Sequence, residues 1–192
     1  MSRIIRAASG EDAPGILDIY NPCILDTFIT FEETPLSLDQ MSARITATMA
    51  QHPWLVCADR NGTILGYAYA TAHAVRASYR WSVDTAIYIH PNHHRRGIAR
   101  SLYEGLFAVL RLQGYVNAFA GVALPNEGSV ALHEALGFAP AGILPQAGFK
   151  LGRWIDVGWW RLGLMPAPGT PLEPVPFPEI VKRKDSALAF RR

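Results

Sequence analysis

The chain has 192 residues, of which 49% are hydrophobic and 18% are charged, and its net charge at pH 7 is +2. This balance predicts a globular protein with a sizeable core and excludes a disordered chain. The net charge is small, and no apolar run reaches the roughly 18 residues of a membrane-spanning helix, so we expect no nucleic-acid partner and no membrane partner.

Hydrophobic periodicity and turn residues predict the elements of the first half of the chain. In chain order these are a strand over 3–7, a helix from about 11 to 26, a loop over 27–34, a helix over 37–50, and strands over 54–58, 64–72 and 81–90. Ser9 can cap the first helix. Asn61-Gly62 lies between two apolar runs, which predicts a hairpin at that point.

The second half predicts a helix over 96–114, a strand over 117–124, a helix capped by Asn126, and strands over 142–150 and 154–164. Six of the 14 prolines then lie between Pro166 and Pro178. This composition predicts no helix before about Ile180 and a segment that wraps the domain or a partner. We divide the chain into a domain over 1–165 and a proline-rich tail over 166–192. The element order predicts an α/β protein of mixed α+β type, with helices on both faces of a mixed sheet.

Residues 90–100, HPNHHRRGIAR, permit two interpretations. Three histidines within five residues suggest a metal site. However, a catalytic zinc ion usually needs three convergent ligands, and the adjacent side chains of His93 and His94 diverge. No HExxH motif or paired carboxylate completes a ligand set, so we predict no metal.

The second interpretation is a phosphate-binding loop. A strand is expected to end at His90 and a long helix to begin near Arg96, and the unpaired N–H groups at a helix start attract anions. Gly97 lets the backbone approach a phosphate closely. Further positive charge comes from Arg95 and Arg100. This context favours phosphate over metal.

The segment His94–Ala99 resembles the (Gln/Arg)-x-x-Gly-x-(Gly/Ala) loop of the GNAT superfamily of N-acetyltransferases, which binds the pyrophosphate of acetyl-CoA. His94 replaces the usual Gln or Arg. A second segment, from Asn126 to Ser129 and from Leu132 to Phe138, resembles the family's N-x-x-S…L-(Y/H)-E-x-L-G-F pattern. The resemblance implies a GNAT fold with a mostly antiparallel central sheet, acetyl-CoA as the co-substrate, and no metal.

Four further segments are similar to the phosphinothricin and methionine sulfoximine N-acetyltransferase branch of that superfamily. They are YRWSVD (79–84), LPN (124–126), GFKLGRW (148–154) and DVGWW (156–160). The similarity covers roughly residues 3 to 164. The positions that it implies for acetyl-CoA binding are Ile87, Tyr88, Ile89, His94, Arg95, Arg96, Gly97, Ile98, Ala99, Arg100, Ser101, Asn126 and Ser129.

Two residues are candidates for catalysis. Acetyl transfer needs a deprotonated amine, whereas α-amines have a pKa of about 8 and are mostly protonated near pH 7. Asp84 lies among apolar residues in a strand and matches the family's catalytic Glu, so we expect it to act as general base, through a water because it is one methylene shorter. His133 could protonate the leaving thiolate or help to hold the substrate. The structural alternatives are an Asp bonded to nearby backbone and a His at a helix boundary.

The substrate candidates are Phe31, Arg76, Tyr79 and Lys150, with Trp154 as a further pocket residue. Arg76 and Tyr79 match substrate-facing positions of the branch. Ala74 stands where the branch often has a basic residue, which argues against phosphinothricin itself. The expected substrate is a small amino-acid-like amine. An acetyltransferase acting on protein N-termini or lysines, and a non-catalytic acyl-CoA-binding module, remain as alternatives.

Cellular location and assembly are predicted more indirectly. The two cysteines, Cys23 and Cys57, are far apart in the sequence and form no CxxC motif. The N-terminus also has no apolar signal core. We therefore expect a cytoplasmic protein. By analogy with the resembling family we expect a homodimer.

Overall fold

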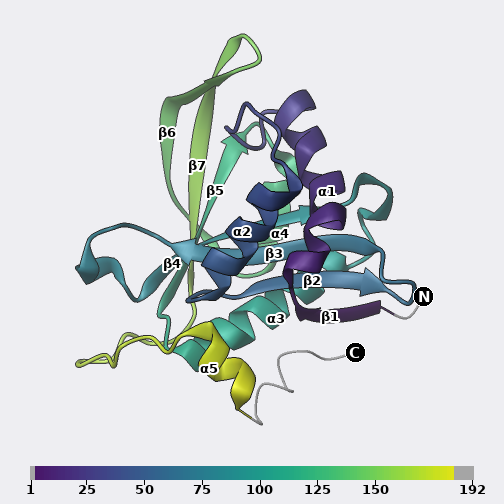
Figure 1. The fold of residues 1–192 in the computed structure, drawn as a ribbon. Coiled ribbons are helices and arrows are strands. Elements are labelled where there is room, and N and C mark those ends of the chain that lie inside the picture. Colours follow the sequence, from purple (N-terminus) through teal and green to yellow (C-terminus); the bar gives the residue numbers. More distant parts are fainter. Residues whose placement is uncertain (1–2, 184–192) are drawn as a thin grey trace.

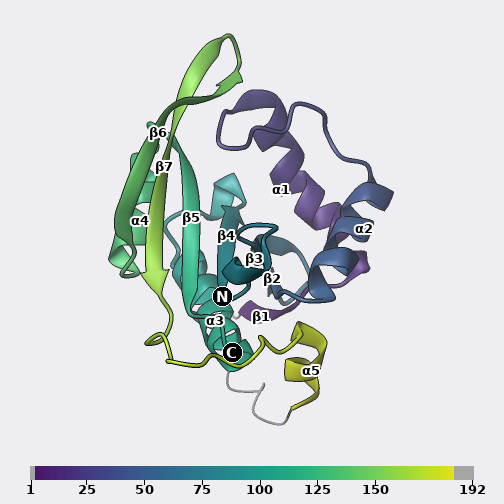
Figure 2. The same ribbon diagram turned by 90° about the vertical axis from the view of Figure 1, so that its left-hand side faces the viewer.

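The computed structural model describes residues 3–183, which form one seven-stranded sheet with helices against both faces (Figures 1 and 2). The strands are β1 (Arg3–Ala7), β2 (Trp54–Asp59), β3 (Ile64–Ala72), β4 (Ser82–Ile89), β5 (Asn117–Leu124), β6 (Ala139–Lys150) and β7 (Arg153–Gly163). The α-helices are α1 (Ala13–Asp26), α2 (Leu38–Met49), α3 (Ile98–Gln113), α4 (Glu127–Ala135) and α5 (Phe177–Lys182). Short 3₁₀ turns cover Gly10–Asp12, Ala77–Tyr79 and Pro91–His93.

The sheet is mixed and mostly antiparallel, which confirms the predicted fold class. Its strand order is β1-β2-β3-β4-β5-β7-β6, and only the central β4–β5 pair is parallel. That parallel pairing joins Ser82–Asp84 to Asn117–Phe119 and then stops. The strands diverge beyond this point, and the divergence creates the main cavity of the molecule.

Two apolar clusters hold the helices to the sheet. On β2, Leu55 and Cys57 belong to the cluster that contains α3, whereas Trp54 and Val56 belong to the cluster that contains α1 and α2. Because successive side chains of a strand point to opposite faces, this alternation explains why helices cover both faces. None of the helices in residues 3–183 has the length and apolar character needed to cross a bilayer.

The predicted caps form at the end of α3 and at the start of α4. Gly114 adopts a left-handed conformation with φ of 91° and ends α3 by donating its N–H to the carbonyls of Leu110 and Arg111. The side chain of Asn126 accepts a hydrogen bond of 3.1 Å from the N–H of Ser129 and so begins α4. These local signals are visible in the sequence, and the boundaries of α3 and α4 agree with them.

The proline-rich segment differs from the sequence prediction. Helix α5 begins at Phe177 rather than near Ile180, because Pro178 occupies the first turn, where its missing N–H leaves no bond unmade. Phe177 and Ile180 are both 1% exposed and pack in the α3 cluster. The side-chain amide of Gln113 donates to the carbonyl of Val175 at 2.8 Å. The part of this segment over 175–180 thus packs against the domain, and the rest of the predicted tail, 184–192, lies outside the described residues.

Strand β6 also begins earlier than expected, at Ala139 rather than Gly142. The segment before Gly142 contains Pro140, which lowers its apparent strand propensity. Proline is tolerated here because β6 is at the edge of the sheet, where one side of the strand needs no hydrogen-bond donor.

Because Phe177 fills the core, its truncation should destabilise the whole domain. We expect Phe177→Ala to lower the free energy of unfolding by about 3–5 kcal/mol, as for other large-to-small core changes. The matched control is Leu172→Ala, since Leu172 lies in the same segment and is 86% exposed. Urea denaturation measures both. Equal midpoints for the two variants would contradict the assignment of this segment to the core.

Candidate active site

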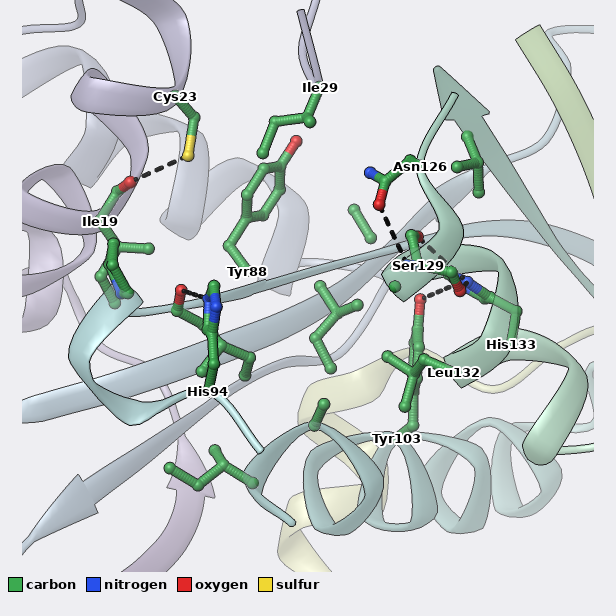
Figure 3. Close-up of a pocket in the computed structure, with 18 of the residues that line it drawn as sticks. Ile19, Cys23, Ile29, Tyr88, His94, Tyr103, Asn126, Ser129, Leu132 and His133 are labelled. Carbon is green, nitrogen blue, oxygen red and sulfur yellow. Dashed lines mark hydrogen bonds between the residues drawn. The ribbon is translucent and has the colours of Figure 1, made fainter. Parts of the chain in front are cut away.

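A cavity of about 1000 Å³ opens where β4 and β5 diverge (Figure 3). Its walls come from Thr85–Ile89 on β4, Gly121–Ala123 on β5, the first turn of α3, helix α4 and one face of α1. The wall is mostly apolar along the strands and basic at the start of α3. This shape suits a long ligand with an anionic group at one end and an uncharged arm.

The basic end of the cavity is built from the start of α3. Arg95 and Gly97 both have positive φ, 57° and 74°, which turn the chain sharply into the helix. The first intrahelical bond runs from the N–H of Ser101 to the carbonyl of Gly97, so the N–H groups of the three residues before Ser101 have no carbonyl partner within the helix. These N–H groups and the positive end of the helix dipole fit a pyrophosphate.

His94 has a structural task in this loop. Its Nε2 lies 3.0 Å from the carbonyl oxygen of Ile89 and donates to it, which ties the loop back to the end of β4. The side chain therefore braces the backbone that surrounds the anion. This explains how the loop keeps its form although His stands where the resembling family has Gln or Arg.

The other two histidines of the segment also have local partners. The Nδ1 atom of His90 accepts a hydrogen bond from the N–H of Asn92, and the ring of His93 lies edge-on to that of His90 at 5.4 Å. Among residues 3–183 there is no group of three His, Cys, Asp or Glu side chains that could hold a metal ion.

Most predicted acetyl-CoA-binding positions line the cavity. They are Ile87, Tyr88, Ile89, His94, Arg95, Gly97, Ile98, Ala99, Arg100, Asn126 and Ser129. Arg96 and Ser101 are outside the lining. The carbonyl of Arg96 accepts a hydrogen bond of 2.7 Å from Arg3, and the hydroxyl of Ser101 donates to the carbonyl of Gly97. Both residues contact the loop from outside the cavity.

His133 lines the cavity on the side away from His94 (Figure 3) and is 3% exposed. Its Nδ1 lies 2.7 Å from the carbonyl of Ser129 and must donate to it, so Nε2 accepts the hydroxyl proton of Tyr103 at 2.9 Å. Burial lowers the pKa of His133, which keeps the ring neutral. Nε2 then has no proton to give, and the hydroxyl of Tyr103, which also lines the cavity, carries the proton of this pair.

Asp84 is the last β4 residue that pairs with β5. It alternates with Val83, which packs in the α3 cluster, and shares a face with Tyr88, which packs against α1. Asp84 is therefore on the face of β4 opposite Val83. The carboxylate is 30% exposed and lies 2.6 Å from Nδ1 of His73. Burial raises the pKa of Asp84, and the hydrogen bond from His73 opposes this effect.

His73 was missed by the sequence analysis. It follows β3, and the antiparallel register pairs Thr71 with Asp84, so the residue two positions after Thr71 falls on the same face as Asp84. The sequence predicts strands over 64–72 and 81–90 but not the register between them, which is what brings His73 to Asp84. No motif marks His73.

The predicted substrate residues lie in two places outside the lining of the large cavity. Tyr79 packs edge-on to the ring of His73 at 6.0 Å, and Arg76 begins the same 3₁₀ turn. Phe31 lies over Gly148 on β6, and the ammonium of Lys150 donates to the carbonyl of Thr30 at 2.7 Å. Lys150 therefore fixes the loop that carries Phe31. Trp154 is 61% exposed and contacts Phe149.

A sheet that diverges at its only parallel pair, with an anion-binding helix start beside the gap, defines an acyl-CoA-dependent transferase. The family model "Acetyltransferase (GNAT) domain" matches residues 5–159. The chain belongs to this GNAT acetyltransferase family, and it transfers acetyl from acetyl-CoA to an amine.

Two relatives and one solved structure illustrate the similarity. The phosphinothricin N-acetyltransferase of Streptomyces viridochromogenes is 36% identical over 89% of this chain and 93% of its own length. The L-methionine sulfoximine/L-methionine sulfone acetyltransferase of Pseudomonas aeruginosa is 34% identical over 89% of this chain and its full length. The crystal structure of a phosphinothricin acetyltransferase from Sinorhizobium meliloti in complex with acetyl-CoA is 33% identical, with a TM-score of 0.86 and coverage of 92% and 97% of the two chains.

The glycine at the start of α3 should be required for the shape of the anion-binding loop. We expect Gly97→Ala to cost about 1–2 kcal/mol of stability, because an L side chain is strained at positive φ, and to raise the Kd for acetyl-CoA. Gly62→Ala is the control, since Gly62 also has a positive φ, 86°, in the β2–β3 turn, outside the lining of the cavity, and a Cβ added there would have no atom within 4 Å. That change should cost similar stability and leave the Kd for acetyl-CoA unchanged. Urea denaturation and calorimetric titration measure both, and unchanged acetyl-CoA affinity in Gly97→Ala would contradict the loop assignment.

Proposed function

We propose that the amine is that of a small amino-acid-like molecule of the phosphinothricin, methionine sulfoximine or methionine sulfone type. The observation that carries this proposal is the position of Asp84, with Tyr79 and Arg76 in the turn that follows β3. Tyr79 contacts His73, the hydrogen-bond partner of Asp84. Arg76 begins the same turn. A cation and an aromatic ring in that turn suit a substrate that has both a carboxylate and an amine. The names of the two relatives support the same substrate class.

In the proposed reaction the amine nitrogen attacks the thioester carbon of acetyl-CoA directly. A C–N bond forms, the C–S bond breaks, and a proton must leave the nitrogen. The carboxylate of Asp84, which is partly buried and whose pKa is raised by burial, belongs to the basic centre that takes up this proton. On the other side of the gap, the hydroxyl of Tyr103 donates a hydrogen bond to His133. This hydroxyl can rotate and donate its proton to the departing sulfur instead. His133 then acts as a positioning residue for Tyr103.

The amine specificity is tested with purified protein, acetyl-CoA and a panel of phosphinothricin, methionine sulfoximine, methionine sulfone, ordinary amino acids and a lysine peptide. Release of free CoA is followed. We expect turnover with the sulfoximine and the sulfone, and weaker turnover with phosphinothricin because Ala74 supplies no second cation. Turnover of the peptide alone would favour the protein-modifying alternative. CoA binding without turnover of any amine would favour a non-catalytic module.

Replacing the carboxylate of Asp84 by an amide tests its role in the basic centre. We expect Asp84→Asn to lower kcat with the preferred amine by roughly 10²-fold or more, the usual contribution of a general base, with little change in the Kd for acetyl-CoA. The control is Asp59→Asn, because Asp59 caps the β2–β3 turn through the N–H groups of Asn61 and Thr63, far along the chain from the cavity. An unchanged kcat in Asp84→Asn would reject the role.

We also infer a homodimer that forms through β6. This strand is at the edge of the sheet, so one side of its backbone is unpaired, and Ile143 and Leu144 are 60% and 52% exposed. An exposed apolar edge of this kind is suited to a second copy of the chain.

The two cysteines are free thiols, which supports a reducing, cytoplasmic location.

Light scattering after size-exclusion chromatography tests the dimer. We expect the wild-type mass to be twice that of the chain and Leu144→Asp to give a monomer, because a carboxylate would be buried at the interface. Leu112→Asp is the control, since Leu112 is 43% exposed on α3 instead. A monomeric wild-type protein would refute the inference.

A further inference from the structure

His73 forms a hydrogen-bonded pair with Asp84 at the point where β4 and β5 part. Its Nδ1 is 2.6 Å from Oδ1 of Asp84. The ring of His73 also stacks on Phe119 at 4.3 Å with an interplanar angle of 18°, and Phe119 is the register partner of Asp84 on β5. The imidazole is therefore held on both diverging strands at once, by a hydrogen bond to one and by stacking on the other.

The surroundings of the ring fix its orientation. The rings of Tyr79 and Trp159 both meet it edge-on at 6.0 Å. Trp159 in turn packs against Gly121, which lines the acetyl-CoA cavity. The pair is thus one ring removed from the cavity wall, on the face of the sheet that carries Asp84. His73 remains 25% exposed, so a small substrate can reach it.

The hydrogen bond also decides which nitrogen is basic. An ionised carboxylate can only accept, so Nδ1 of His73 must be the donor, and Nε2 of the neutral ring carries a free lone pair. Among the described residues, none is hydrogen-bonded to Nε2, whereas both ring nitrogens of His133 are occupied. A carboxylate that holds one nitrogen of an imidazole and leaves the other to accept a proton is the arrangement by which hydrolases activate a nucleophile.

We propose that His73 is the catalytic base of this acetyltransferase, with Asp84 as its positioning residue. The inference rests on the proposed amine acetylation and names the group that performs its proton transfer. As the amine nitrogen bonds to the thioester carbon, its proton passes to Nε2 of His73. The resulting imidazolium is stabilised by the carboxylate of Asp84, and the electron pair of the C–S bond leaves on sulfur. The imidazole returns its proton to solvent after the product has left.

The residue types support this division of roles. A general base is most effective when its pKa is near the working pH, and an imidazole ordinarily titrates close to neutrality whereas a carboxylate titrates far below it. Asp84 is also one methylene shorter than the Glu found at this position in the resembling family. The ring of His73 extends the reach of the shorter carboxylate.

The first test compares His73→Ala with the wild-type protein, using acetyl-CoA and methionine sulfone. We expect kcat at pH 7 to fall by about 10²-fold or more, with the KM for acetyl-CoA nearly unchanged. The loss should shrink as the pH is raised towards 9, because the amine then deprotonates by itself. This pH dependence has few competing groups. Among the described residues, the rings that face the pair belong to Phe119, Trp159 and Tyr79, and only Tyr79 carries an ionisable group.

Chemical rescue separates a base from a merely structural ring. Added imidazole should raise the rate of His73→Ala at least tenfold. The increase should be proportional to the concentration of unprotonated imidazole. The control is His52→Ala, which also removes a stacked imidazole, in this case from Tyr115. Imidazole should leave the rate of that variant unchanged. A His73→Ala enzyme within threefold of wild type, or one that imidazole does not rescue, would overturn the proposal.

A second measurement does not depend on turnover. ¹⁵N chemical shifts of the histidines in the wild-type protein should show a protonated Nδ1 and a bare Nε2 for His73 at neutral pH, and Asp84→Asn should abolish this preference. The opposite tautomer would overturn the proposal even if every amine in the panel failed. Failure of the whole panel, with the expected tautomer, would instead reject the substrate class.

Discussion

The site depends on the short parallel pairing between β4 and β5. Three residue pairs hold the two strands together, and after Asp84 they separate. Residues of the separated strands, together with the start of α3, line the cavity that we propose for acetyl-CoA. Antiparallel neighbours on both sides keep the two strands from closing the gap. The candidate functional residues are therefore arranged around the gap between β4 and β5, and the pairing in the rest of the sheet keeps this gap open.

The groups near this gap differ in burial and hydrogen bonding between the two faces of the sheet. On the α3 face, His133 is buried, its pKa is lowered by desolvation, and both of its nitrogens are engaged. On the opposite face, Asp84 and His73 are partly exposed and keep one nitrogen free. A group that must accept a proton from substrate needs access to it, whereas a group that orients a neighbouring hydroxyl can be buried. The difference in burial thus matches the difference in proposed role.

The loop before α3 shows how a departure from a family pattern is accommodated. The superfamily pattern places Gln or Arg where this chain has His94, and the ring instead bonds to the carbonyl of Ile89. The anion-binding N–H groups belong to the backbone, so they depend on the shape of the loop more than on any one side chain. The same reasoning applies to Arg96 and Ser101, which brace the loop from outside the cavity.

The sequence by itself determined most of the elements, though not the starts of α5 and β6, and it indicated an anion-binding loop, because periodicity, caps such as Gly114 and Asn126, and the segment around Gly97 are local signals. It also indicated Asp84, as a lone carboxylate in an apolar strand. Only the tertiary structure decided that His73 meets Asp84, because that contact depends on the register of two strands and on stacking against a third. It likewise decided that Phe177 is a core residue, since a proline-rich composition does not reveal which side chains find a partner helix.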